Sequence, residues 1–365
     1  MARVSAGGRL HFGFCNLSLS HERLYGALGL ALEAPRVAVS AQPAESVTTT
    51  HTDDAAPEQS VTASNERTTT PAVGDGETVA ADALCEAVHE YALRAVDFLE
   101  VPGASVTVES TLPRHVGLGS GTQLAVTTLA AVSRAHGVEP RVRERAPALG
   151  RGGRSGVGVA AFESGGFVLD AGHPTTRFTT DRPVDGEWTV PPVAARHAVP
   201  ADWRFLLVRP AVDPGRSGDD EDASMRAAVE HADPELADRI AGIVTRRVLP
   251  ALATGHAEAF GEAVATVGRL NGAWYTDEQG GVYRPPVGDV VASLSSSPAV
   301  FGAGQSSWGP TVYGVTDATR AEEAADAGER ALTAAGVDGS VSVVRAANDG
   351  ARVTVEAGDR DDGTT

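Results

Sequence analysis

The stretch Pro113–Gln123, which reads PRHVGLGSGTQ, decides what kind of site this chain can build. It follows an alternating segment that predicts a strand, Ser105–Ser110, and runs into an apolar segment, Leu124–His136, that predicts a buried helix. Glycine lets a backbone approach an anion closely, and the first N–H groups of a helix have no partner within it. The stretch therefore predicts a phosphate-binding loop, with Ser120 and Thr122 as hydroxyl donors. An ordinary turn that binds no ligand is the alternative.

The composition of the chain excludes several classes of protein. The chain has 365 residues with 30 Lys and Arg against 48 Asp and Glu, none of the cations being lysine, and its net charge is −18. An acidic surface without lysine predicts a halophilic cytoplasmic protein, with a GC-rich genome as the alternative explanation. The acidity argues against nucleic acid and membrane surfaces as partners. Two cysteines do not make a disulfide framework, and no spacing indicates a zinc site.

Patterning divides the chain into two domains, residues 1–190 and 200–357, followed by a tail at 358–365. A polar insertion is expected at about 42–77, because large apolar residues are nearly absent there. A Gly-rich turn is expected at Tyr25–Gly29, and a hairpin is expected from Gly156–Glu163 and Gly166–Ala171. Helices are predicted at Glu77–Leu99, Leu124–His136, Pro234–Thr254, His256–Leu270 and Ala318–Ala335. The other predicted strands are Leu10–Leu19, Arg36–Ala41, Arg204–Arg209, Ala299–Gly304, Thr311–Val315, Ser340–Arg345 and Arg352–Glu356.

Three segments together resemble the GHMP kinase superfamily. Pro113–Gly121 resembles its phosphate-binding motif, Arg9–Gly13 lies where the family has its first motif, and Phe301–Pro310 lies where it has a C-terminal Gly-rich motif. The resemblance implies an α+β, two-domain GHMP-kinase-like fold. Its N-terminal domain would resemble domain 2 of ribosomal protein S5, and its C-terminal domain would be ferredoxin-like.

A narrower resemblance is to the archaeal β-ribofuranosylaminobenzene 5′-phosphate synthases. It is carried by Arg9–Ser18, Tyr25–Leu32, Arg114–Gln123 and Gly150–Gly158. It implies phosphoribosyl transfer from phosphoribosyl pyrophosphate to p-aminobenzoate or 4-hydroxybenzoate, with release of CO2 and pyrophosphate, in methanopterin-type pterin synthesis. Mg²⁺ is expected with the pyrophosphate and no flavin is expected. A homodimer is plausible from the family.

The residues themselves favour a synthase over a kinase of the same superfamily. Many of those kinases carry an aspartate in a Ser-Gly-x-Asp position, where it acts as a base, whereas Ser155–Gly158 here holds no carboxylate. Arg151 and Arg154 could grip a phosphate, a pyrophosphate or a carboxylate by paired hydrogen bonds, unless they only solvate an acidic surface. An ATP-dependent small-molecule kinase remains the alternative, and a binding protein without chemistry is a third reading.

The candidate site residues fall into three sets. The catalytic candidates are Arg151, Arg154, His11 and Asn16. The phosphate-binding candidates are Arg114, His115, Gly117, Gly119, Ser120, Gly121 and Thr122. The substrate-binding candidates are Tyr25, Ser155, Arg216, Ser217, Gln305, Ser306 and Ser307. Trp274, Tyr275 and Trp308 could stack on an aromatic acid, or could simply pack in a core. The metal ligands stay unassigned, the available carboxylates being Glu33, Asp170, Asp213 and Asp219–Asp222.

Overall fold

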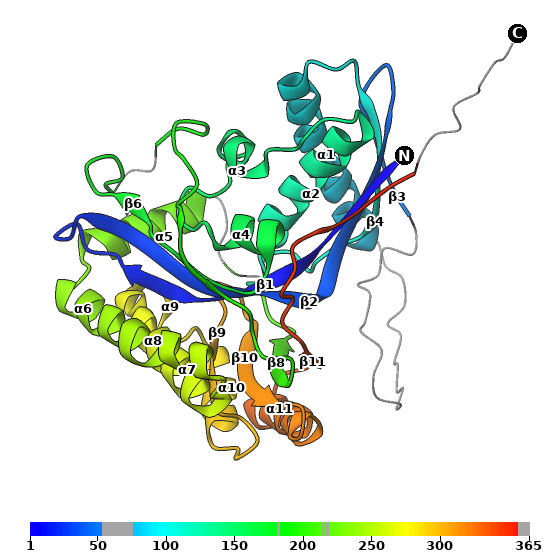
Figure 1. Ribbon diagram of the computed structural model, residues 1–365. Coiled ribbons are helices and arrows are strands. Elements are labelled where there is room, and N and C mark those ends of the chain that lie inside the picture. The colour runs from blue at the N-terminus through cyan, green and yellow to red at the C-terminus, as the bar shows by residue number, and fades with distance from the viewer. Residues whose placement is uncertain (53–75, 181–182, 214, 216–218, 357–365) are drawn as a thin grey trace, which may run out of the picture.

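Two sheets with helices around them make up the part of the chain that the computed structural model describes, residues 1–52, 76–180, 183–213, 215 and 219–356. Figure 1 shows the larger sheet running across the molecule, with α1 and α2 on one side and α6, α7 and α8 on the other. The mixed architecture confirms the expected α+β fold. The predicted insertion falls largely in 53–75, and this stretch, like the predicted tail, lies outside the described residues.

The larger sheet has eight strands and is organised by a long antiparallel pair, β1 and β2. Its main order is β12-β1-β2-β4-β3, while β5 and β6 pair with β2, and β7 pairs with β5. Its strands are β1 (Ala2–Asn16), β2 (Arg23–Pro43), β3 (Thr48–His51), β4 (Ala104–Ser110), β5 (Phe167–Asp170), β6 (His173–Pro174), β7 (Val193–His197) and β12 (Arg352–Val355).

The smaller sheet has four antiparallel strands in the order β11-β8-β10-β9. These are β8 (Trp203–Pro210), β9 (Gly302–Gln305), β10 (Val312–Asp317) and β11 (Gly339–Val344). The α-helices are α1 (Gly76–Leu99), α2 (Ser120–Ala135), α3 (Val142–Arg145), α4 (Val157–Ser164), α5 (Asp219–Glu230), α6 (Pro234–Ile243), α7 (Leu249–Thr254), α8 (Ala257–Trp274), α9 (Thr276–Gln279), α10 (Val287–Ser295) and α11 (Ala321–Ala335). A 3₁₀ turn (Ala146–Leu149) follows α3, and a π-helical turn (Val244–Val248) joins α6 to α7.

A register shift in β1 places the strand in two different cores. Val4 packs in the core beneath α1 and α2, whereas Phe12 packs in a core shared with α8 and the smaller sheet. The irregularity between Gly7 and Arg9 explains the change, because two steps along β1 face five along β2, and an odd offset in register turns the following side chains to the opposite face. The ring of Phe12 lies edge-on to Tyr313, with the ring centroids 4.9 Å apart. The two halves of the chain are therefore joined by a continuous apolar core.

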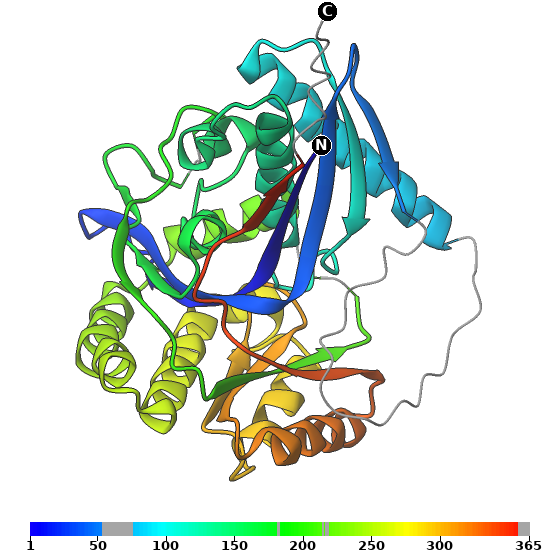
Figure 2. The same cartoon turned by 45° about the vertical axis from the view of Figure 1, so that its right-hand side comes forward.

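The last strand does not stay with the second half of the chain. Residues 352–355 form β12, which pairs antiparallel with β1 from Ala2 to Ser5. Figure 2 shows this red strand beside the dark blue N-terminal strand. The predicted second domain extends to residue 357, whereas residues 352–355 lie in the larger sheet.

Two local predictions are wrong. Tyr25–Gly29 is not a turn but part of β2, and a Cβ on Gly29 would lie only 2.2 Å from the Leu10 carbonyl oxygen, so glycine serves close strand approach there. Gly156–Glu163 is not a strand of a hairpin, because Val157–Ser164 forms helix α4. This segment is apolar throughout, and a short apolar run does not reveal its period.

Candidate active site

The glycine-rich loop ends at helix α2, as the sequence predicts. Gly119 is the N-cap residue, with a left-handed φ of 77° and no side-chain cap, and the helix begins at Ser120. Gly117 is also left-handed, and a Cβ there would lie 2.1 Å from the Ser306 carbonyl oxygen. Only glycine fits this close crossing of two chain segments. The N-terminus of α2 is thus left without a side-chain partner, which suits an anion.

The loop is held by its carbonyl groups. Arg9 donates from Nη1 to the Gly117 oxygen at 2.6 Å, and Ser306 donates from Oγ to the same oxygen at 2.8 Å. The backbone N–H of Arg9 donates to Leu118 O at 2.9 Å. These contacts fix the carbonyl groups of the loop against protein donors. Arg9 was not among the predicted site residues, although it lies in the first motif that the sequence analysis quoted.

The C-terminal motif supports the loop more than it faces the cleft. Ser306 is fully buried, and its Oγ also accepts from the backbone N–H of His11 at 3.1 Å. Gln305 is occupied as well, since Nε2 donates to Ser307 O at 3.2 Å and Oε1 accepts from Arg284 N at 3.3 Å. These contacts give Gln305 and Ser306 positioning roles, whereas Ser307 lines a pocket described below.

The two predicted arginines lie in different places. Arg151 lies over the start of α2, and Arg154 lines a charged pocket. The Nη1 atom of Arg151 lies 3.2 Å from the place that a Cβ on Gly121 would take. Arg151 also donates to the hydroxyl of Tyr91 and lies over that ring, with Cζ 5.6 Å from the centroid. Arg154 has 14% of its side chain exposed and pairs with Glu221, with Nη1 3.1 Å from Oε1, and with Asp222.

Helix α5 supplies two carboxylates, Glu221 and Asp222, that pair with Arg154. Burial raises the pKa of Glu221, partly offset by Arg154, and Arg9 and Arg151 act on it too. Burial alone would lower the pKa of Arg154, but the charges of Glu221, Tyr25 and Asp222 raise it. Arg154 is therefore the arginine that contacts Glu221, while Arg9 and Arg151 act on this carboxylate only through their charge. No helix is predicted for this acidic run, although the apolar spacing of Met225, Ala228 and Val229 is a signal of a packed helix.

Asp170 links the segment Gly150–Gly158 to strand β2 through hydrogen bonds. Its Oδ1 accepts from the backbone N–H groups of Ala27 at 3.1 Å and Gly172 at 2.9 Å, and its Oδ2 accepts from Gly156 N at 2.7 Å. The Ser155 hydroxyl lies 3.5 Å from Oδ2. Burial raises the pKa of Asp170 to about 6, against the effect of these donors. Its oxygens are thus committed to positioning the backbone around Ser155.

The other predicted residues occupy different places. Asn16 closes the β1–β2 turn, because Nδ2 donates to Arg23 O at 2.7 Å and Oδ1 accepts from Ser18 N at 2.8 Å. Tyr25 borders a charged pocket with Arg154. Three others stand near the loop. Arg114 and His115 are exposed, and Thr122 lies against Gly158 of α4. Arg216 and Ser217 lie outside the described residues.

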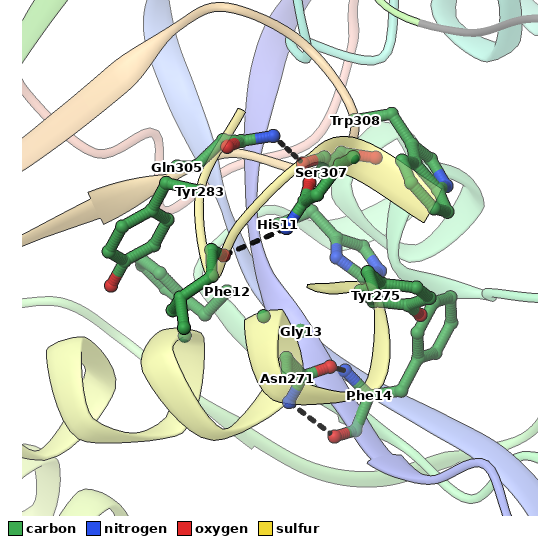
Figure 3. Close-up of a pocket in the computed structure, with 14 residues that line it drawn as sticks. His11, Phe12, Gly13, Phe14, Asn271, Tyr275, Tyr283, Gln305, Ser307 and Trp308 are labelled. Atoms are coloured by element: carbon green, nitrogen blue, oxygen red, sulfur yellow. Dashed lines mark hydrogen bonds between the residues drawn. The ribbon is translucent and has the colours of Figure 1, made fainter. Parts of the chain in front are cut away.

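Two pockets meet at the aromatic rings near this site. The first, of about 450 Å³ including its open mouth, lies between β1, α8 and the C-terminal motif. Figure 3 shows the rings of His11, Tyr275 and Trp308 gathered on one side of it. The second, of about 640 Å³, is charged and is lined by Tyr25, Arg154, Asp222 and Met225, among others. The Tyr275 hydroxyl reaches Met225 Sδ at 3.7 Å, so Tyr275 stands between the two pockets.

Family models match both halves of the chain. The N-terminal domain of GHMP kinases matches residues 80–166, and the C-terminal domain of GHMP kinases matches residues 248–334. The matches cover α2 with its loop and α8 with the C-terminal glycine-rich strand. With the two-sheet fold, these matches define the class: the chain has the two-domain GHMP-kinase fold.

In sequence the chain is similar to archaeal synthases. It is 38% identical over 58% of its length to the β-ribofuranosylphenol 5′-phosphate synthase of Methanothermobacter thermautotrophicus, in an alignment that spans 63% of that relative. It is 29% identical to the protein of the same name from Archaeoglobus fulgidus, covering 87% of this chain and 88% of that one. In fold it resembles a homoserine kinase from Cytophaga hutchinsonii, with 17% identity, a TM-score of 0.59 and 97% of each chain covered.

Two features of the described residues concern metal ions and membranes. No group of three or more His, Cys, Asp or Glu side chains is placed to hold a metal ion in the part of the chain that the structure describes. Among the same residues, no helix is long and apolar enough to cross a membrane.

Proposed function

We propose that the chain is a phosphoribosyltransferase that acts on phosphoribosyl pyrophosphate and 4-hydroxybenzoate. The products would be β-ribofuranosylphenol 5′-phosphate, CO2 and pyrophosphate. The name shared by these relatives specifies a phenol. This favours 4-hydroxybenzoate over p-aminobenzoate as the acceptor. The observation that carries the proposal is that Arg9 and Arg151 lie at the N-terminus of α2, because phosphoribosyl pyrophosphate carries a phosphate and a pyrophosphate that need such anion-binding groups.

The chemistry explains why cations would dominate the donor side. The bond from ribose C1 to the pyrophosphate oxygen breaks, and the electron pair leaves with pyrophosphate. The ring carbon that bears the carboxylate then attacks C1, and the electron pair of its bond to the carboxylate restores the aromatic ring as CO2 departs. The arginines would stabilise the leaving pyrophosphate, and Glu221 lies close enough to them to stabilise positive charge on the sugar.

Mg²⁺ is part of this proposal. Mg²⁺ is commonly held by one or two protein carboxylates together with phosphate oxygens and water. Glu221 and Asp222 are adjacent carboxylates in the cleft, and both lie beside Arg154. They are the residues that would hold the ion, which would neutralise pyrophosphate charge when bound. Substrate binding would then exchange some of their contacts with Arg154 for contacts with the ion.

The test is pyrophosphate release by purified protein in molar KCl with Mg²⁺. Release should require both phosphoribosyl pyrophosphate and the benzoate, and it should not require ATP. Mass spectrometry of the product and capture of CO2 would complete the balance. Release of ADP from ATP in the presence of a small alcohol, with no pyrophosphate release, would instead establish the kinase alternative. The missing carboxylate at Ser155–Gly158 favours the synthase.

The proposal includes the setting in which the enzyme works. The net charge of −18 without any lysine favours a salt-rich cytoplasm, where screening reduces self-repulsion. Activity should therefore rise between low and molar KCl. Light scattering under the same conditions would test the homodimer that the family resemblance suggests.

A further inference from the structure

The pocket between β1 and α8 differs from the phosphate loop, because its lining consists of neutral side chains. Its lining is apolar or neutral and consists of His11, Phe12, Gly13, Phe14, Gly268, Asn271, Gly272, Tyr275, Gln279, Val282, Tyr283, Gln305, Ser307 and Trp308. Its empty space of about 450 Å³ includes the open mouth, so the pocket is a partly open recess and not an enclosed cavity. A pocket of this composition selects a flat apolar body.

Aromatic rings make up the wall nearest the loop. The rings of Tyr275 and Trp308 lie with centroids 4.5 Å apart and planes inclined by 57°. His11 meets Phe14 edge-on at 4.9 Å. Ring edges and faces at these distances favour a further aromatic ring by stacking or edge contact.

Most polar groups in the pocket are already used. The Asn271 amide accepts from Phe14 N at 2.6 Å and donates to Phe14 O at 2.9 Å, as Figure 3 shows. The Gln305 amide is held by backbone groups as described above. By contrast, the structure gives neither the His11 ring nor the Ser307 hydroxyl a hydrogen bond among the described residues. Burial and then the charge of Arg9 lower the pKa of His11 to about 3, so its ring is neutral. A neutral imidazole can accept from a hydroxyl group.

The pocket also lies next to the charged site. His11 accepts on its carbonyl from Ser307 N at 3.3 Å, and Ser306 links the His11 backbone to the phosphate loop. On the other side, the Tyr275 hydroxyl reaches Met225, which lines the charged pocket together with Arg154. A molecule in the aromatic pocket would therefore lie beside the charged pocket.

We propose that this pocket binds the ring of the aromatic acid acceptor, stacked beside Trp308 and Tyr275, with its hydroxyl group hydrogen-bonded to His11. This inference rests on the proposed function, since that function requires an aromatic acceptor. It divides the enzyme into an arginine-lined donor side and a neutral aromatic acceptor side that meet at Tyr275.

The decisive variant is Trp308→Leu, with Trp274→Leu as the matched control. Trp274 is the last residue of α8, directly before Tyr275, and is partly buried, but it does not line the pocket. Equilibrium dialysis with 4-hydroxybenzoate alone measures binding without turnover. Trp308→Leu should weaken binding at least tenfold and raise the KM for the benzoate, while the KM for phosphoribosyl pyrophosphate stays unchanged. Trp274→Leu should leave all three values within twofold.

A second variant covers the case in which Trp308→Leu does not fold. Val282 lines the pocket and is 36% exposed, so Val282→Trp would fill the solvent side of the pocket without disturbing the core. It should abolish binding of the acid. Unchanged binding and an unchanged benzoate KM in folded Trp308→Leu or Val282→Trp protein would overturn the acceptor pocket and leave the synthase function intact.

The two proposals fail in different ways. If the wild-type protein binds 4-hydroxybenzoate through Trp308 but releases no pyrophosphate, the pocket stands and the proposed reaction fails. If turnover occurs but dialysis finds no binding of the acid to the free enzyme, the same titration in the presence of pyrophosphate and Mg²⁺ decides. Binding that then depends on Trp308 supports the pocket, and no binding overturns it.

Discussion

The charged pocket and the aromatic pocket, although neighbours, are built on opposite principles. The charged pocket places Arg154 between Glu221 and Asp222 of α5. The aromatic pocket contains no ionised group, and its single imidazole is kept neutral by burial. One surface can thus receive a highly charged molecule while the surface next to it receives a flat neutral ring.

The difference shows how one fold can offer two kinds of binding surface side by side. The anion loop is made of backbone and would suit any phosphate, whether of ATP or of a sugar. What distinguishes this chain lies around the loop, in side chains of β1, α5, α8 and the C-terminal motif. Changes confined to one pocket should therefore affect one substrate and spare the other.

The largest effect is expected from Arg154→Ala. The variant removes the guanidinium and leaves Glu221 and Asp222 without their cation, so the cleft would repel pyrophosphate. We expect kcat/KM to fall by roughly 10²- to 10³-fold, the loss typical for one preorganised charge donor. Steady-state pyrophosphate release measures it. Arg143→Ala, which removes an ion pair with Glu163 outside both pockets, should retain activity within twofold, and an equal loss there would deny Arg154 a special role.

A smaller but structural effect is expected from Asp170→Asn. One carboxylate oxygen would become an amide that points its own hydrogens at backbone N–H groups, so the free energy of unfolding should fall by about 2–3 kcal/mol. Guanidinium unfolding in molar KCl measures the change. Asp326→Asn on the exposed face of α11 serves as the control and should change it by less than about 0.5 kcal/mol. Equal stability of the two variants would show that the network around Asp170 is not needed.

The neutral state of His11 can be tested through pH. Its pKa is about 3 in the fold, below its usual 6.5, so the unfolded chain takes up the proton first as pH falls. This group's contribution to stability is complete above pH 6.5 and declines toward pH 3, by up to about 1.4 kcal/mol per pH unit. The difference in unfolding free energy between wild type and His11→Gln should shrink over that window. A constant difference would mean that His11 titrates normally.

The smallest effect is expected from Tyr275→Phe. The tyrosine hydroxyl makes only a long contact, 3.7 Å to the sulfur of Met225, and sulfur is a weak acceptor. Both KM values and kcat should stay within about threefold, because the ring at the boundary of the pockets is kept. Tyr275→Ala, which removes the ring, should raise the benzoate KM far more. A larger loss in Tyr275→Phe would give the hydroxyl a direct role in the reaction.

Features that depend on local sequence rules can be predicted from the sequence, whereas contacts that depend on the register between distant segments cannot. The loop at Gly117–Gly121, the helix after it and the pair Arg151 and Arg154 follow from glycine content and spacing. The place of Arg9 does not, because it depends on the register shift in β1 that aims alternate side chains at the loop. The ion pair of Arg154 with α5 joins positions 67 apart in sequence, which no periodicity reveals.

The pairing of β12 with β1 has a consequence for synthesis on the ribosome. Ala2–Ser5 find this neighbour only when residues 352–355 have been translated, so one edge of β1 stays open while the residues between them are made. Open strand edges attract other chains. A nascent or prematurely terminated chain would therefore associate with other chains more readily than the finished protein does. A cell that produces this protein would have to remove such truncated products.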